Sequence, residues 1–190
     1  MQVDILDIPG ALSLKPKRFG DDRGYFTETY NHSTLAGLGL PDHFVQDNES
    51  YSAEPGTLRG LHAQLPPFAQ AKLVRVLDGR ILDVIVDARR DSPRYGEHVT
   101  VELNAATGTQ VFVPSGCLHG FLTLEPDTRV SYKVDAHYDQ ASDRSIAWDD
   151  PDLAIEWPVS TGAVILSNKD QNALAWRDFD SPFRMKGDAS

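Results

Sequence analysis

The sequence predicts an all-β domain, either an antiparallel barrel or a sandwich. Short strand-like runs alternate with Gly, Pro and Asp turns from about Val3 to Tyr138, which is typical of such domains. Apolar and polar residues alternate with a period of two within the clearest runs, the pattern of a strand with one buried face. Because 190 residues suit one domain with a substantial core, we expect a single domain over residues 1–183 and a loose tail over residues 184–190.

Strands are predicted where β-branched and aromatic residues fall between turn residues. In chain order they are Gly24–Tyr30, Phe44–Ser50, Leu58–Gln64, Lys72–Leu77, Arg80–Ala88, Val99–Leu103, Gln110–Val113, His119–Leu124 and Arg129–Asp135. The turns Asp78-Gly79 and Ser115-Gly116 separate neighbouring strands. One short helix is expected near Ser33–Leu38, and the chain beyond Tyr138 reads as irregular.

Alternation also predicts which polar side chains face the interior. Tyr132 is in phase with Val130, and Lys72 is in phase with Val74, so both should point inward. An inward tyrosine is most often packing, whereas an inward lysine is rare as pure structure and favours a functional role. Asp83 shares its strand face with Ile81 and Ile85. We expect it to partner a histidine or a lysine, because a buried charge needs a partner.

Strict alternation creates a conflict in the strand Leu58–Gln64. It places Arg59 and His62 on opposite faces, although both are candidates to line one pocket. A glycine, Gly60, lies between them, and glycine inside a strand often marks a bulge that re-aims a side chain. We therefore predict an irregularity at Gly60.

Composition excludes several classes of function. The formal net charge of −10 argues against nucleic-acid and anionic-membrane partners, which need basic surfaces. No run approaches the ~18 apolar residues of a membrane span, and the acidic N-terminus lacks the pattern of a signal peptide. We expect a cytoplasmic protein.

The single cysteine, Cys117, rules out an internal disulfide and fits a reducing compartment. His119 lies two residues away, which raises the possibility of a cysteine nucleophile. No oxyanion loop or orienting third residue is visible, so a small buried thiol is the better interpretation.

Two glycine-spaced stretches resemble the two-part signature of the cupin barrels. They run from Gly56 through His62, Gln64 and Lys72 to Gly79, and from Gly108 through Pro114 and Gly116 to His119. In that signature a second His stands where this chain has Gln64, and a Glu stands near Lys72; these two and the two remaining His hold one metal ion. A lysine ammonium has no lone pair and cannot be a ligand. The resemblance therefore implies a cupin barrel that lacks its metal.

His62 and His119 are candidates for acid–base chemistry, because imidazole titrates nearest neutrality. Each is about as well explained as a satisfied core histidine. Tyr132 could deliver a proton from a buried phenol, whose O–H needs a partner there.

Nine motifs in order resemble the dTDP-4-dehydrorhamnose 3,5-epimerase family and cover roughly residues 3–176. They are Phe19–Glu28, Val45–Ser50, Gly56–Gln64, Ala71–Val76, Asp83–Gly96, Val113–Phe121, Tyr132–Tyr138, Trp148–Pro151 and Ser167–Asp170. Each motif alone is weak, but their joint order is highly specific.

The resemblance implies an all-β cupin-type double-stranded β-helix, or jelly roll, with short peripheral helices. It implies no cofactor and no metal, and a homodimer that exchanges an N-terminal strand. The implied enzyme inverts positions 3 and 5 of dTDP-4-dehydro-6-deoxy-D-glucose, giving dTDP-4-dehydro-L-rhamnose. Its partner is thus a dTDP-linked 4-keto sugar.

Catalytic roles are implied for four residues. His62 matches the base, Asp170 its orienting carboxylate, Tyr132 the acid on the opposite face, and Lys72 the cation near the developing enolate. Contacts with the nucleotide sugar are implied for Arg23, Glu28, Gln46, Asn48, Arg59, His119, Tyr138, Asp143 and Lys169. Of these, Arg23 and Glu28 are expected to reach across the dimer, and Asp143 stands where a longer Glu is usual.

Three other functions remain open on the sequence. A family member that epimerises only position 3 or only position 5 could share every residue named above. A metal-dependent cupin such as a dioxygenase would want the His and Glu that are absent. A non-catalytic module that binds sugar nucleotides would explain the cations, but not an inward set of His, Lys and Tyr.

Overall fold

The structure, a computed structural model, describes residues 1–41, 43–159 and 163–185. The strands are β1 (Gln2–Ile5), β2 (Leu12–Lys15), β3 (Arg18–Asp21), β4 (Gly24–Thr27), β5 (Gln46–Ser52), β6 (Leu58–Gln64), β7 (Lys72–Asp78), β8 (Arg80–Asp87), β9 (His98–Asn104), β10 (Gln110–Val113), β11 (Cys117–Thr123), β12 (Thr128–Val134) and β13 (Asp143–Ser145). The helices are α1 (His32–Ala36) and α2 (Asn168–Gln171), followed by a 3-10 turn over Trp176–Asp178.

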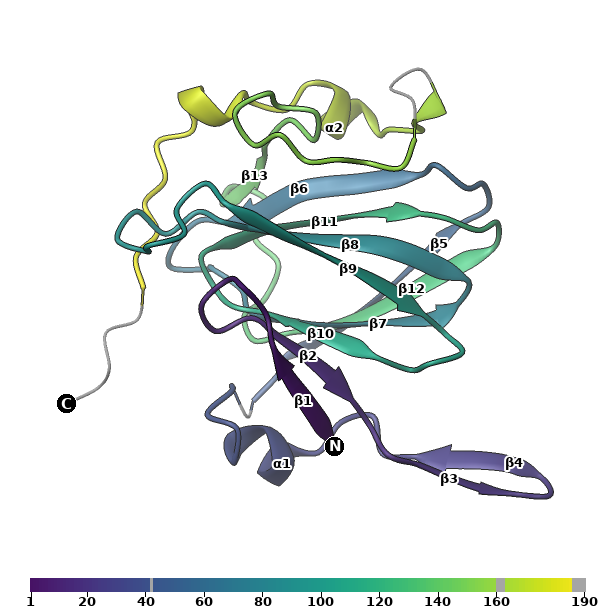
Figure 1. Cartoon of the computed structure of the whole chain (residues 1–190). Coiled ribbons are helices and arrows are strands. Elements are labelled where there is room, and N and C mark those ends of the chain that lie inside the picture. Colours follow the sequence, from purple (N-terminus) through teal and green to yellow (C-terminus); the bar gives the residue numbers. More distant parts are fainter. Residues whose placement is uncertain (42, 160–162, 186–190) are drawn as a thin grey trace.

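Two antiparallel sheets face each other across one core (Figure 1). The six-stranded sheet has the order β1-β2-β10-β7-β12-β5, and the five-stranded sheet has the order β13-β6-β11-β8-β9. Buried aliphatic side chains such as Val74, Val130, Ile81 and Ile85 fill the space between them. This alternating, two-sided burial is what the period-two pattern predicts, and the all-β prediction is confirmed.

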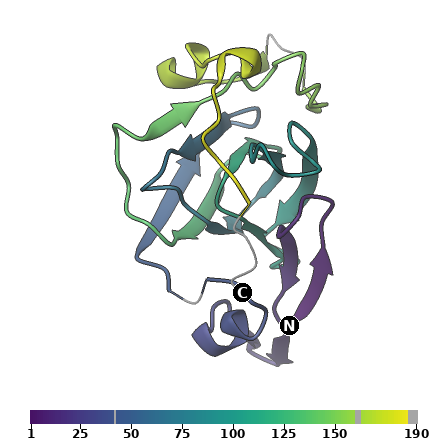
Figure 2. The same cartoon turned by 90° about the vertical axis from the view of Figure 1, so that its left-hand side faces the viewer.

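Short segments cover the outer faces of both sheets, and the view in Figure 2 keeps the same order of layers. The segment after β13 packs Leu153 and Phe179 onto Leu61 and Leu118 of the five-stranded sheet. On the other side Leu35 of α1 joins a cluster with residues of β2, β7 and β10. Within the described residues, no helix is long and apolar enough to cross a membrane.

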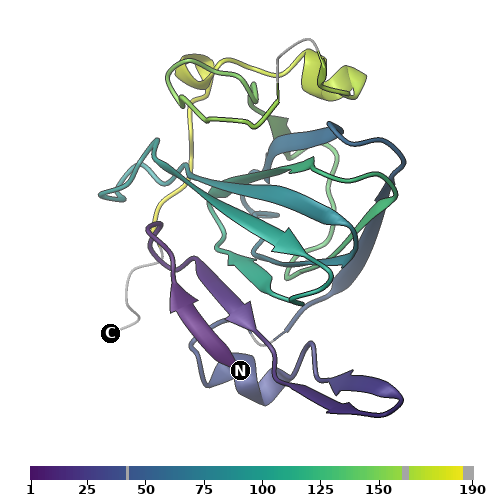
Figure 3. The same ribbon diagram turned by 45° about the vertical axis from the view of Figure 1, so that its right-hand side comes forward.

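The β3–β4 hairpin extends away from the barrel (Figures 1 and 3). Its root is held by Arg18, whose guanidinium donates to the carbonyl oxygens of Ala105 and Ala106. Beyond that anchor Phe26 and Tyr25 are 70% and 58% exposed. Large exposed apolar side chains that lie close together are typical of an interaction surface.

The predicted irregularity in β6 is confirmed. His62 pairs with His119 of β11, whereas Arg59 pairs with Phe121, so β6 carries one extra residue in this interval. Gly60 within it has a φ of 138°, and a Cβ built there would lie 2.4 Å from the Cα of Gly120. Only glycine fits this backbone and this close approach.

Most predicted strands are confirmed, with shifted ends. The predicted strand Gly24–Tyr30 ends early, at Thr27, because the chain leaves the hairpin there. The short strands β1, β2, β3 and β13 and the helix α2 were not predicted. They are three or four residues long, too short for periodicity to reveal. Most of the predicted tail, residues 186–190, lies outside the described residues.

Replacing Gly60 by Ala should destabilise the fold strongly. The added methyl meets backbone atoms that cannot rotate away, and the positive φ adds strain, so we expect a loss of about 3 kcal/mol in the free energy of unfolding. Urea unfolding of the purified variant measures this. Gly39→Ala is the control, because Gly39 has a φ of 71° but open space around its Cβ; equal losses in the two variants would contradict the steric argument.

Candidate active site

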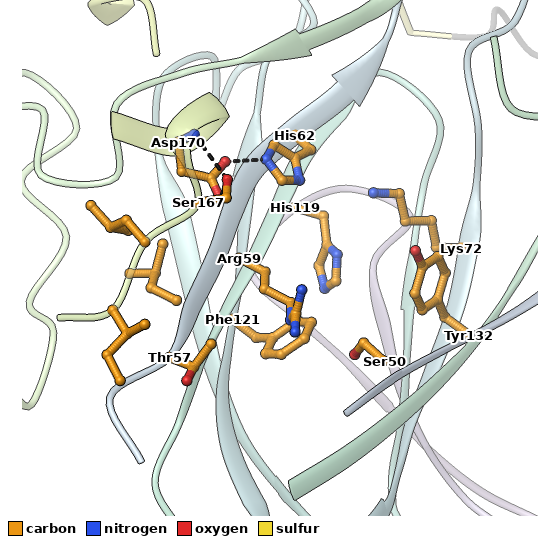
Figure 4. Close-up of a pocket in the computed structure, with 13 residues that line it drawn as sticks. Ser50, Thr57, Arg59, His62, Lys72, His119, Phe121, Tyr132, Ser167 and Asp170 are labelled. Carbon is orange, nitrogen blue, oxygen red and sulfur yellow. Dashed lines mark hydrogen bonds and ion pairs between the residues drawn. The ribbon is translucent and has the colours of Figure 1, made fainter. Parts of the chain in front are cut away.

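A polar pocket opens between the two sheets. Its first lobe has a volume of about 400 Å³ and is lined by Ser50, Thr57, Leu58, Arg59, His62, Lys72, His119, Phe121, Tyr132, Ile165, Leu166, Ser167 and Asp170 (Figure 4). A second lobe of about 370 Å³ shares His62, Lys72 and Tyr132 with the first. The three shared residues therefore stand where the lobes meet.

Opposite walls of the pocket carry different chemistry. Lys72 on β7 and Tyr132 on β12 come from the six-stranded sheet. His62 on β6 and His119 on β11 come from the five-stranded sheet, where they are directly paired. The Lys72 ammonium points across the pocket towards His62, and the Tyr132 hydroxyl lies on the same side as Lys72 (Figure 4). The predictions that Tyr132 and Lys72 point inward are confirmed.

His62 is held by a carboxylate from the C-terminal segment. Its Nε2 lies 2.5 Å from Oδ1 of Asp170, and Asp170 Oδ2 accepts a hydrogen bond of 2.8 Å from the Ser167 hydroxyl. Ser167 also caps α2 by accepting from the Asp170 backbone N–H. Because an ionised carboxylate only accepts, Nε2 carries the proton and Nδ1 is left with its lone pair.

The position of Asp170 depends on contacts far from it in the chain. Ile165 forms a parallel bridge with Thr57 just before β6, and its backbone bonds to Leu58 and Gly56. This bridge ties the segment that leads into α2 to the start of β6. The bridge therefore helps to hold His62 and Asp170 beside each other.

The environment keeps His62 neutral and Asp170 ionised. Burial lowers the pKa of His62 below its ordinary value, and the nearby cations Lys169 and Lys72 add to this, while Asp170 opposes it. Burial alone would raise the pKa of the Asp170 carboxyl, but hydrogen bonds from His62 and Ser167 outweigh it and lower that pKa. A neutral imidazole beside a carboxylate is the arrangement of a general base.

Lys72 and Tyr132 are also shifted by burial. Desolvation lowers the pKa of Lys72 to about 8, against the raising influence of Asp83 and Asp143. Burial raises the pKa of the Tyr132 phenol, so the phenol keeps its proton near neutral pH. One wall of the pocket thus offers an ammonium and a protonated hydroxyl, and the other offers a base.

His119 lies deeper, and the prediction that Asp83 partners a His or Lys is confirmed. His119 Nε2 is 2.8 Å from Asp83 Oδ2, and both side chains are buried. His119 lines the first lobe beside Phe121. The hydrogen bond to Asp83 therefore fixes the orientation of the His119 ring. The other ring nitrogen, Nδ1, is available to a ligand in the pocket.

Gln64 has become a structural residue. Its amide nitrogen donates to the carbonyl oxygens of Phe68 and His137, and its amide oxygen accepts from the Asp139 backbone N–H. The side chain is buried, and these bonds join the loops that follow β6 and β12. No group of three or more His, Cys, Asp or Glu side chains suited to a metal ion occurs among the described residues.

Five of the predicted contact residues line the second lobe: Gln46, Asn48, Tyr138, Asp143 and Lys169. They form a connected set. Gln46 bonds to Asn48 and to the backbone of Tyr138, while Asp143 accepts from the Tyr138 hydroxyl and pairs with the Lys169 ammonium. Arg59 lines the first lobe and reaches the Tyr51 carbonyl of β5.

Arg23 and Glu28 lie outside both lobes. Arg23 sits at the tip of the β3–β4 hairpin with its side chain 89% exposed and paired with Asp21, and Glu28 follows β4 on the surface. The structure does not bring these two residues to the pocket of their own chain.

Several pocket residues were not predicted. Thr57, Ile165 and Leu166 line the first lobe because of the bridge between residues 57 and 165. No local sequence pattern predicts this bridge. Ser50 and Ser167 both lie at the ends of recognised motifs, and that position was the available signal. Cys117 is buried, which confirms the prediction of a small buried thiol, and burial raises the pKa of this thiol to about 12.

Comparison with known proteins gives a consistent picture. A family model described as dTDP-4-dehydrorhamnose 3,5-epimerase matches residues 5–178. A relative of that name from Sinorhizobium fredii is 48% identical over 176 residues, which are 90% of this chain and 88% of the relative. Crystal structures of such epimerases align from Bacillus anthracis, with TDP and pyrophosphate bound (49% identity, TM-score 0.89, 92% and 98% coverage), and from Legionella pneumophila, in complex with dTDP-4-keto-L-rhamnose (38% identity, TM-score 0.92, 97% and 98% coverage).

Proposed function

The chain belongs to the dTDP-4-dehydrorhamnose 3,5-epimerase family, and on that premise we propose how its jelly-roll barrel inverts positions 3 and 5 of dTDP-4-dehydro-6-deoxy-D-glucose to give dTDP-4-dehydro-L-rhamnose. One observation carries the assignment of roles: a neutral base, His62, faces a protonated phenol, Tyr132, across one pocket. Inversion requires a base and an acid on opposite faces of the reacting carbon, because return of the proton to its original side regenerates the substrate.

His62 removes the proton. The carbons at positions 3 and 5 flank the 4-keto group, and loss of either proton moves charge onto the keto oxygen. Nδ1 of His62 has the free lone pair, since Nε2 is bonded to Asp170. After the transfer the imidazolium is stabilised by the Asp170 carboxylate.

Lys72 stabilises the enolate. Its ammonium points towards His62 across the place where the lobes meet (Figure 4). A fixed cation in a desolvated pocket acts strongly on charge that develops only during the reaction. No metal is needed for this step, because the ammonium supplies the positive charge and Gln64, which stands in the place of a metal ligand, is already bonded to three backbone groups.

Tyr132 returns a proton on the other face. Its phenol comes from the sheet opposite His62, and the raised pKa keeps it protonated at the working pH. Solvent then restores the proton of Tyr132 and takes the one on His62, so each inversion exchanges one carbon-bound proton with solvent.

The second lobe suits the nucleotide end of the substrate. Tyr138 is exposed at the mouth of the pocket and offers an aromatic face for a nucleobase. Lys169 offers a cation for the diphosphate once a ligand displaces its bond to Asp143. Gln46 and Asn48 complete the polar lining of this lobe, whereas Arg59 and His119 line the first lobe, where the sugar would lie.

A homodimer would bring Arg23 and Glu28 to the site. The exposed aromatic residues of the β3–β4 hairpin need a cover, and β5, which borders the second lobe, is an edge strand of its sheet. An extended hairpin from a second copy can pair with such an edge. Arg23 of that copy would then add a further cation to those that one chain provides.

A cytoplasmic location stays a prediction.

Solvent exchange tests the proposed function. In deuterium oxide the enzyme should introduce deuterium at positions 3 and 5 of the 4-keto sugar and form the L-rhamno product, measured by NMR. Tyr132→Phe should still exchange protons but form product at least about 100-fold more slowly, because the acid is lost. Exchange at one position only would indicate a single-position epimerase, and none at either would leave only a binding role.

Asp170→Asn should change both rate and pH dependence. Without the carboxylate we expect proton abstraction to slow by about 10²–10⁴-fold. Asp170 raises the pKa of His62, so its removal lowers that pKa further, and the acid limb of the kcat/KM profile should move to lower pH. An acid limb that stays in place or moves to higher pH would contradict the assignment of His62 as the base.

Mixed dimers test whether Arg23 acts across the interface. Arg23→Ala and His62→Asn should each be nearly inactive, but co-expression should restore about a quarter of the activity, because half of randomly paired dimers are mixed and each holds one complete site. His62→Asn mixed with Asp170→Asn is the control, since both residues belong to one chain's site, and it should restore nothing. No recovery in the first mixture, with dimers formed, would place Arg23 outside the partner's site.

A further inference from the structure

Asp83 has a feature that the catalytic roles above do not explain. It lies on β8 with 0% of its surface exposed. One carboxylate oxygen, Oδ2, bonds to His119, but the other, Oδ1, has no hydrogen-bond partner among the described residues. A buried polar atom without a hydrogen-bond partner lowers stability by about 1–3 kcal/mol. A purely structural role therefore does not account for an aspartate at this position.

The bonded oxygen fixes the orientation of His119. A carboxylate only accepts, so Nε2 of His119 carries the proton and Nδ1 is presented to the pocket. His119 is paired with His62 in the β6–β11 register. Asp83 therefore sets a ring that lies directly beside the base.

The charge of Asp83 also acts on Lys72. The charges that act on this ammonium are Asp83 on β8, Asp143 on β13 and Lys169 on α2. Lys72 also lines the first lobe together with His62 and Arg59 on β6, His119 on β11 and Tyr132 on β12. Among the charges, Asp83 does most to raise the pKa of Lys72 against burial, which still lowers it to about 8. Without Asp83, burial would lower that pKa further.

The location of Asp83 suits a supporting role. It lines neither lobe of the pocket, so it does not touch the substrate, whereas Lys72 lines both. A carboxylate behind the pocket wall holds a proton on the lysine while the ammonium stays nearer to the developing negative charge.

We propose, resting on the function above, that Asp83 is a positioning residue that orients His119 and supplies the negative charge that keeps Lys72 protonated during enolate formation. It acts through these two side chains and takes no part in proton transfer itself.

Asp83→Asn tests this, because it keeps the shape and removes the charge. The pKa of Lys72 should fall, and the basic limb of the kcat/KM profile should move to lower pH by about one unit. The loss of activity should accordingly be larger at pH 8 than at pH 6.5. Binding of thymidine diphosphate, measured by calorimetry, should stay within about twofold of wild type, because the site for the nucleotide is elsewhere.

Matched variants separate this role from simple destabilisation. Asp150→Asn removes another buried carboxylate, one that accepts from the backbone N–H groups of Asp152 and Trp176; it should lower stability and leave the basic limb in place. Asp83→Glu keeps the charge and should keep the limb near its wild-type position. If Asp83→Asn does not fold, Asp83→Ser, which leaves space for a water molecule, replaces it.

A uniform loss of activity across the pH range in Asp83→Asn, with the basic limb unmoved, would overturn the proposal. So would a limb in Asp83→Glu lowered as far as in Asp83→Asn, because geometry and not charge would then control Lys72. Both results leave the epimerase reaction of the wild-type enzyme intact, whereas failure of the proposed function would appear as absent exchange in the wild type.

Discussion

The close approach of β6 and β11 at Gly60 and Gly120 is the constraint on which the site depends. A Cβ on either glycine would lie 3.0 Å or less from the other strand's backbone. Because the strands come this close, β6 can carry an extra residue between Arg59 and His62, and both side chains then face the pocket. A regular strand would send one of them into the outer cluster with Leu61. The bulge therefore decides whether a base and an arginine share one cavity.

Desolvation provides the second layer of control, and carboxylates moderate it. Burial pushes His62 and Lys72 towards their neutral forms and keeps the Tyr132 phenol protonated. For the proposed base this is useful, and Asp170 orients the ring and favours the imidazolium that forms. For Lys72 burial works against the proposed role, in which a charged ammonium stabilises the enolate. Desolvation thus favours the neutral form that the proposed base, His62, needs. On the opposite wall it disfavours the charged form of Lys72, and nearby carboxylates oppose it there.

The sequence revealed the parts of the site that follow from local patterns. The strands Leu58–Gln64 and Gln110–Val113 have the predicted limits, and the bulge at Gly60 follows from a conflict of faces. The bridge of Thr57 to Ile165 was out of reach, because pairing between segments a hundred residues apart leaves no periodic trace. The bonds of Gln64 were equally hidden, since their partners are backbone groups of any residue type.

Gln64 shows how a barrel of this type can lose a metal ligand while its strands stay in place. A metal ligand must have a free lone pair, whereas the Gln64 amide is hydrogen-bonded to backbone groups of Phe68, His137 and Asp139. Those bonds fix the loop that carries Tyr138, so a position that bound a metal in other barrels now shapes the second lobe. In the proposed reaction Lys72, from the opposite sheet, supplies the positive charge instead. An ammonium differs from a metal ion in that its charge depends on its surroundings. In the proposed arrangement Asp83, which is buried beside His119, supplies negative charge that favours the protonated lysine.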